Sequence, residues 1–156
     1  MKFVRLLLLP PAFLAVGLVR LLDKVGILIR FGEFWSERIG HLAGNTEVYL
    51  CEKDAGKHPG FHIWFHRHPI SNRYLAKMLS RVMCIDRSGF SRIVVLLMQL
   101  WKGWERHVVA PTQLGRDILN LFEKQPPHLQ FTAAEERRGE AWLKSQGING
   151  KFVCFN

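Results

Sequence analysis

The stretch from residue 26 to residue 54 constrains the fold most, because it has the pattern of a strand, a glycine-bearing loop and a helix in succession. Residues 27–29, Ile-Leu-Ile, form a short apolar run between Gly26 and Gly32, which is typical of a buried parallel strand. After the loop, with Ser36 as the expected N-cap, residues recur at helical spacings of three and four: Ile39, Leu42, Ala43, Thr46, Tyr49 and Leu50. This is the first half of a βαβ unit, in which ligands bind at the carboxyl end of the strand.

The composition fits one ordered domain with an anionic partner. The chain has 156 residues, of which 48% are hydrophobic, so it can form a packed core. Its formal net charge of +9 favours nucleic acid, acidic lipid headgroups or phosphorylated substrates. Because no nucleic-acid-binding motif is present, we expect no nucleic-acid partner. The cysteines, Cys51, Cys84 and Cys154, form no CxxC pair, so they indicate buried free thiols and no metal site.

Residues 1–25 form an apolar N-terminal segment with basic flanks. Lys2 and Arg5 precede an uncharged run over residues 6–19, which is shorter than the about 20 apolar residues of a spanning helix. A signal peptide fits the basic and apolar regions, but no clean cleavage site follows. We expect an uncleaved segment over residues 12–24 that either lies on a membrane surface or packs on its own domain. The expected location is the cytoplasm, with peripheral contact to the inner face of the cell membrane under the first alternative.

Residues 61–66, Phe-His-Ile-Trp-Phe-His, have the aromatic and β-branched content of a strand. His62, His66 and His68 are two or four residues apart and share one face of such a strand, which is the minimum geometry for a metal site. Since no cysteine or carboxylate accompanies them, we expect three surface histidines at the strand end.

The next helix is expected to begin near Ser71, which serves as its cap while Ile70 packs on Leu75. Basic residues then recur every four positions along one face: Arg73, Lys77 and Arg81. Such a stripe is either a solvated face or a surface that contacts anionic lipid or a phosphorylated substrate.

Three further elements are expected before the tail. They are a mostly buried helix over residues 92–104, a short strand over residues 107–109, and a helix over residues 112–124. The last helix is expected to face inward through Leu114, Ile118, Leu121 and Phe122. The pair of prolines at residues 126–127 ends it and marks the best candidate domain boundary.

The tail has clear local signals. Thr132 and Glu135 form a capping box for a helix, and Gly147 is the expected residue just past its end. Residues 151–155 are expected to form a buried strand. A terminal strand with nothing after it is what the opening strand of a second, missing domain would look like.

Three blocks occur in one order: IRFGEFWSERIGHLAGNTEVYLCEKDAG, HPISNRYLAKML and PPHLQFTAAEERRGEAWLKSQGINGKFVCFN. From about Gly26 to the end, this pattern resembles a family of bacterial glycosyltransferases found with surface-polysaccharide genes. More distantly, ILIR followed by IGHLAGNTEVYL is similar in layout to the opening of lipopolysaccharide heptosyltransferases, which have the GT-B fold. The resemblance implies an α/β chain that is the Rossmann-like N-terminal domain of a GT-B glycosyltransferase.

The resemblance also implies a domain organisation. Residues 26–125 are the acceptor-side domain, and residues 126–156 are an interdomain helix and the first strand of a C-terminal domain that is missing. In GT-B enzymes the C-terminal domain holds most nucleotide-sugar contacts, so the chain is expected to bind nucleotide sugar and acceptor glycan only with that domain, and to transfer no sugar alone. No cofactor is implied, and no DxD motif indicates a metal.

The resemblance suggests a candidate site. In the heptosyltransferase-like layout, an acidic residue that follows a glycine after the first strand serves as base. Here His41 follows Gly40, which makes His41 the candidate general base, with a structural histidine at the helix start as the alternative. Glu33, Arg38 and Asn45 lie close by in sequence and are the candidate substrate-binding residues.

A second hypothesis belongs to a different class of function. The chain would be the non-catalytic product of a truncated gene, or a basic module that binds a membrane or a partner chain. Its net charge, apolar N-terminus and final strand all fit this hypothesis. The coding sequence downstream of residue 156 would discriminate between the two.

Overall fold

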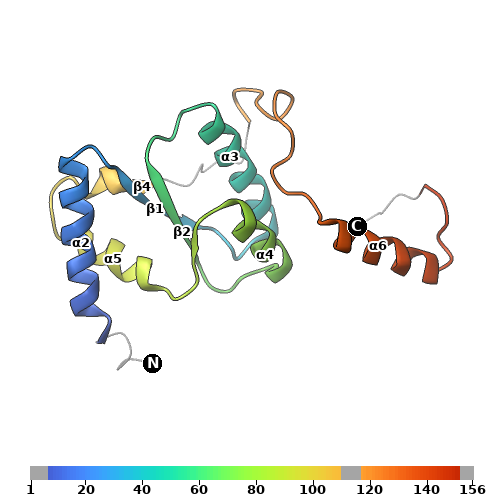
Figure 1. Cartoon of the computed structure of the whole chain (residues 1–156), viewed down its shortest axis with the longest axis horizontal. Helices are drawn as coiled ribbons and strands as arrows, with labels where there is room; N and C mark the ends of the chain where they lie inside the picture. Colours follow the sequence, from blue (N-terminus) through green and yellow to red (C-terminus); the bar gives the residue numbers. More distant parts are fainter. Residues whose placement is uncertain (1–6, 110–116, 152–156) are drawn as a thin grey trace.

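The computed structural model describes residues 7–109 and 117–151 (Figure 1). Its centre is a sheet of four strands in the order β3-β2-β1-β4, and every pairing is parallel. The strands are β1 (Ile29–Phe34), β2 (Phe61–His66), β3 (Ile85–Asp86) and β4 (Val108–Val109). The expected mixed α/β class is confirmed, and this strand order is compatible with a Rossmann-like fold.

Helices cover both faces of the sheet (Figure 1). The helices α2 (Leu9–Lys24) and α5 (Phe90–Met98) pack on one face, and α3 (Thr46–Asp54) and α4 (Arg73–Val82) pack on the other. The first cluster contains Ala12, Val16, Val19, Phe31, Phe65, Val94 and Met98. The second contains Phe34, Leu42, Tyr49, Leu50, Trp64, Leu79 and Val109. The change of face after β3 follows from the strand order, since the chain must cross back over β2 and β1 to reach β4.

The central strand β1 is where the sequence predicts one, but it begins two residues later and is longer. Ile27 is 51% exposed and precedes the strand, whose first partner pairing is Ile29 with Phe61. Gly32, expected to start a loop, is inside the strand opposite Trp64. A Cβ at Gly32 would lie 2.6 Å from the Trp64 ring, so the glycine serves close packing here and makes no turn.

The helix after β1 begins at Ile39 and passes into a π-helical segment, η1 (His41–Asn45), which continues directly into α3. Ser36 does not cap this helix, in contrast to the sequence prediction. Its side chain is fully buried, and its hydroxyl donates to the Arg67 carbonyl at 2.7 Å. The Ser36 carbonyl in turn accepts from the Ser71 amide at 2.7 Å. Ser36 therefore joins the end of β1 to the loop after β2.

The described part of the N-terminal segment contains the helix α2, which is docked on its own domain. Pro10 and Pro11 fall in the first turn of α2, where no intrahelical donor is lost, so they begin the helix rather than break it. Ala12, Val16 and Val19 are buried against α5 and the sheet. Within residues 7–109 and 117–151, no helix combines the length and apolar character needed to cross a membrane.

The strand β2 has the bounds that the sequence predicts, but its histidines are not all on the surface. His62 is buried, and its Nδ1 accepts from the Tyr49 hydroxyl while its Nε2 donates to the Pro59 carbonyl at 3.0 Å. In the following helix, Asn72 rather than Ser71 is the N-cap, because the Asn72 Oδ1 accepts from the Leu75 amide at 2.9 Å.

The elements after β3 are shorter than the sequence predicts. The apolar run expected as one helix over residues 92–104 divides into α5, a turn and the short helix η2 (Trp104–His107), before β4. The described part of the expected helix over residues 112–124 consists of turns, because Asp117 Oδ2 accepts from the Phe122 amide at 2.7 Å. Ile118 and Phe122 are exposed and do not face inward.

The tail helix α6 (Ala133–Ser145) has the predicted capping box and the predicted glycine, Gly147, with a φ of +76°. It stands away from the sheet in Figure 1, and it buries no residue. The expected strand over residues 151–155 lies outside the described residues, apart from Lys151.

Candidate functional site

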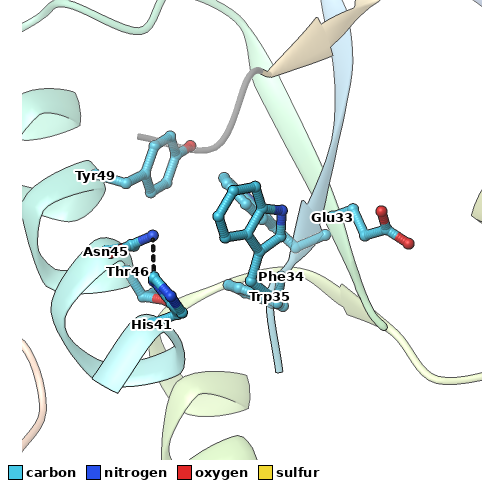
Figure 2. A pocket seen from close by; sticks show the side chains of 8 residues that line it. Glu33, Phe34, Trp35, His41, Asn45, Thr46 and Tyr49 are labelled. Atoms are coloured by element: carbon cyan, nitrogen blue, oxygen red, sulfur yellow. Dashed lines mark hydrogen bonds between the residues drawn. The ribbon is translucent and has the colours of Figure 1, made fainter. Parts of the chain in front are cut away.

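A small pocket lies at the carboxyl end of β1, where the sequence pattern predicts ligand binding (Figure 2). Its interior volume is about 10 Å³, which is room for about one water molecule. The lining residues come from β1 and the residue after it, from the following helix and from β2: Glu33, Phe34, Trp35, His41, Asn45, Thr46, Tyr49 and Trp64. The structure thus brings three of the four predicted site residues, Glu33, His41 and Asn45, to one place.

His41 and Asn45 are one turn apart on the π-helical segment η1, and their side chains contact each other (Figure 2). The Asn45 Nδ2 lies 3.3 Å from the His41 Nδ1. The wider turn of a π-helix is uncommon and occurs often at functional sites. The Trp35 ring meets the His41 ring edge-on at a centroid distance of 5.3 Å. His41 is therefore held from two sides.

The contact with Asn45 selects one tautomer of a neutral His41. Because the Asn45 Nδ2 only donates, the His41 Nδ1 must accept, and the ring proton is then on Nε2. In this state the Nε2–H of His41 donates a hydrogen bond. For Nε2 to accept a proton as a base, the Asn45 amide must turn over so that its oxygen accepts from a proton on Nδ1.

Glu33 lies at the end of β1 next to two arginines. Arg67 Nη2 donates to the Glu33 carboxylate at 2.7 Å, and Arg92 Nη2 is 4.0 Å from its other oxygen. The hydrogen bond to Glu33 raises the pKa of the Arg67 guanidinium. The same guanidinium lies 5.9 Å from the centre of the Trp35 ring. The Glu33–Arg67 ion pair therefore lies beside the Trp35 ring at this pocket.

The inner wall of the pocket is aromatic and neutral. Burial raises the pKa of Tyr49 and lowers the pKa of His62, so neither group is charged near neutral pH. The Trp64 ring packs against Phe34 at a centroid distance of 4.7 Å. Its buried Nε1 lies near the Tyr49 hydroxyl, but it makes no hydrogen bond of normal geometry among the described residues. Such a donor is a place where a water or a ligand oxygen would be favourable.

The remaining predicted residues lie elsewhere. Arg38 is exposed and does not line the pocket, and its carbonyl accepts from the Leu42 amide at the helix start. The basic stripe is not continuous, because Arg81 donates to both oxygens of Glu135, at 2.9 Å and 2.5 Å. Arg73 and Lys77 are exposed on the same helix. Arg81 therefore links α4 to α6 through Glu135, and its guanidinium is not free to bind an anion as the stripe predicts.

The sequence did not single out three residues at this site: Trp35, Trp64 and Arg67. Their proximity follows from the register of the sheet, in which Gly32 is opposite Trp64 and Phe34 is opposite His66, next to Arg67. The pocket residues do not include three groups of the kind that hold a metal. Among the described residues, three such groups come close together at Glu47, Cys51 and His128, between α3 and the segment before α6.

Comparison of the chain with protein-family models, with curated proteins and with solved structures finds no match.

Proposed function

We propose that this chain is the acceptor-side domain of a GT-B glycosyltransferase that acts in cell-surface polysaccharide biosynthesis. One observation carries the proposal: Glu33, His41 and Asn45 converge with aromatic side chains at the carboxyl end of the central parallel strand. The parallel α/β architecture and the resemblance of the sequence blocks agree with it. In this proposal the chain forms the acceptor side of a cleft, and a second domain supplies the donor side.

In this proposal a sugar ring lies on the mouth of the pocket, because the interior has room only for about one water molecule. Trp35 is the apolar platform for the ring, and Glu33, positioned by Arg67, accepts from a sugar hydroxyl. The Nε2–H of His41 donates to the same sugar in the tautomer that Asn45 selects. His41 becomes a general base for the acceptor hydroxyl only after the Asn45 amide turns over.

The test is calorimetric titration of the full chain with a panel of acceptor-type oligosaccharides and, separately, with nucleotide sugars. The resemblance implies glycan binding only together with a second domain, but the candidate acceptor residues all lie on this chain. We therefore expect weak glycan binding by the chain alone, which falls about tenfold in Trp35→Ala and in Glu33→Gln. The matched control is Trp142→Ala, since Trp142 is exposed on α6 away from the pocket. Tight binding of a nucleotide sugar, or glycan binding that survives both pocket substitutions, would overturn the proposal.

A specific observation favours a second candidate function, peripheral contact with a membrane. The face of α2 and its C-cap opposite the buried residues exposes a stripe of large apolar side chains: Leu14, Leu18, Leu21 and Val25. Beside it, a groove of about 390 Å³ is lined by Phe13, Leu21 and Trp101 together with the cations Arg20 and Lys24. Exposed apolar and basic side chains on one helix are typical of interfacial helices that bind anionic lipid.

Vesicle sedimentation tests this second candidate. The full chain should sediment with vesicles that contain an anionic phospholipid, and the double substitution Leu14→Ser and Leu18→Ser should leave it in the supernatant. Trp142→Ser removes an equally exposed apolar side chain from α6 and should change nothing. A chain that stays in the supernatant with anionic vesicles at low salt would contradict the membrane role.

A further inference from the structure

Three side chains of different metal-binding types meet where the segment before α6 returns to α3. Glu47 and Cys51 are one turn apart on α3, and His128 comes from the loop after the paired prolines. One ligand atom from each of them lies within 4.8 Å of the others. Cys51 is only 2% exposed, and the side chain of His128 is 16% exposed. The group is therefore partly enclosed and is fixed by the fold rather than by chance contacts on the surface.

The local charge at this place is negative, although the whole chain has a formal net charge of +9. The His128 Nδ1 and backbone amide both donate to Glu47, at 2.9 Å and 3.0 Å, and its Nε2 contacts Asp54 at 3.1 Å. Burial lowers the pKa of His128, but the hydrogen bonds that Glu47 and Asp54 accept from it outweigh burial and raise the pKa. Burial raises the pKa of the Cys51 thiol, and Glu47, Asp117 and Asp54 raise it further. A cation is the favourable occupant of such a site.

We propose that Glu47, Cys51 and His128 bind a divalent transition metal, for which zinc is the best match, while Asp54 accepts from the His128 Nε2 and orients the ring. A thiolate, an imidazole and carboxylates are the ligand types that zinc uses, whereas magnesium and calcium take oxygen ligands. In a tetrahedral zinc site these ligand atoms lie roughly 3.3–3.7 Å apart. The observed upper limit of 4.8 Å leaves about 1 Å to be closed by side-chain rotation.

Metal binding releases protons from two of the ligands. Cys51 loses its thiol proton as the sulfur binds the metal, and a protonated His128 loses a ring proton as one nitrogen binds. Glu47 contributes a carboxylate oxygen, and Asp54 keeps its contact with the Nε2 of His128. Each ring nitrogen of His128 faces a carboxylate, so this place accommodates positive charge, which a bound metal would supply.

The predicted consequence of binding is local order in the segment that leads to α6. Glu47 and His128 are 81 residues apart, and the described residues 117–131 contain turns but no helix or strand. A metal bound to both α3 and this segment would cross-link them, as structural zinc sites do. This role does not depend on the glycosyltransferase proposal, because the pocket residues are not among the ligands.

The experiment uses the untagged, reduced full chain titrated with Co²⁺, followed by displacement with Zn²⁺. We expect one bound Co²⁺ per chain, visible bands of tetrahedral cobalt and a thiolate-to-cobalt charge-transfer band in the near ultraviolet, all lost when Zn²⁺ is added. Cys51→Ser should abolish the charge-transfer band, and the matched control Cys84→Ser, which changes an exposed cysteine outside the cluster, should keep it.

His128→Gln provides a second variant, because the partly buried His128 is on a loop and its change is less disruptive to folding than one at the buried Cys51 of α3. It should weaken metal binding at least tenfold, while circular dichroism of the metal-free chain stays unchanged. Absence of a charge-transfer band in the wild-type chain, its persistence in Cys51→Ser, or unchanged affinity in His128→Gln would overturn the proposal.

Discussion

Replacing Gly32 by alanine tests whether the packing under the pocket is as tight as the structure indicates. Gly32 is in the middle of β1, opposite Trp64 of β2. A Cβ added there would lie 2.6–2.7 Å from three carbon atoms of the Trp64 ring. That separation is about 1 Å shorter than an ordinary carbon contact of about 3.5–4.0 Å. Either the ring or the strand must move.

The expected cost follows from the kind of neighbour. Trp64 cannot yield easily, because it is stacked on Phe34 and packed edge-on against Tyr49 at a centroid distance of 4.5 Å. Overpacking of this type costs about 1–3 kcal/mol. With a urea m-value of about 1–3 kcal/mol/M, the unfolding midpoint should fall by roughly 1 M. Trp64 also lines the pocket, so glycan binding should weaken in the same variant.

The assay is urea unfolding followed by far-ultraviolet circular dichroism, with Gly40→Ala as the matched control. Gly40 has helical backbone angles and nothing within 4 Å of an added Cβ. That control should unfold at an unchanged or slightly higher urea concentration. If Gly32→Ala unfolds at the same concentration as Gly40→Ala, Trp64 does not pack on Gly32 and the geometry of the pocket wall is wrong.

Three further predictions concern single contacts. Arg81→Ala should accelerate amide hydrogen exchange over α6, because it removes the contact with Glu135. The urea midpoint should not change, because α6 buries no residue. The control Arg73→Ala, on α4 like Arg81, should have no effect. In chelator-treated protein, the stabilisation lost in His128→Gln should be largest below pH 6.5 and should vanish as the pH rises through the raised pKa of His128. Nitrogen NMR should find the ring proton of His41 on Nε2, and Asn45→Asp should move it to Nδ1, since a carboxylate only accepts. Unchanged exchange rates in Arg81→Ala would refute the first prediction. A stability difference for His128→Gln that does not depend on pH would refute the second, and the same His41 tautomer in the wild-type chain and in Asn45→Asp would refute the third.

The strongest local signals in the sequence predict structure well. The aromatic run of β2 has the bounds of the observed strand, and the capping box at Thr132 and Glu135 forms as expected. Both depend on residues that are adjacent or a few positions apart. The site residues Glu33, His41 and Asn45 also come together, because they follow one strand and begin one helix.

Features that depend on tertiary contacts could not be predicted from the sequence. Gly32 has the appearance of a loop residue until the position of Trp64 is known. The turns at residues 117–124 replace a helix because Asp117 binds backbone amides locally, which competes with helical hydrogen bonds. The cluster around His128 has no spacing signal, since its partners are contributed by α3.

The sequence also did not predict which charged side chains form ion pairs. Arg73, Lys77 and Arg81 have identical spacing, and only the position of α6 shows that Glu135 occupies Arg81. The N-terminal segment left two alternatives open, and the burial of Ala12, Val16 and Val19 shows that it docks on the domain. The apolar stripe on the opposite face of α2 is exposed, and it supports the proposed contact with a membrane.

Chemical-shift mapping tests the proposed acceptor site most directly. An acceptor-type oligosaccharide would be titrated into the uniformly ¹⁵N-labelled full chain, and the backbone amide and indole resonances would be followed. Binding at the pocket predicts concentration-dependent shifts that cluster at Glu33, Trp35, His41 and Asn45 and at the Trp64 indole, with the indole of Trp142 unchanged. Shifts confined to the groove beside α2 or to α6, or no shifts with any glycan of the panel, would contradict an acceptor site at the carboxyl end of β1.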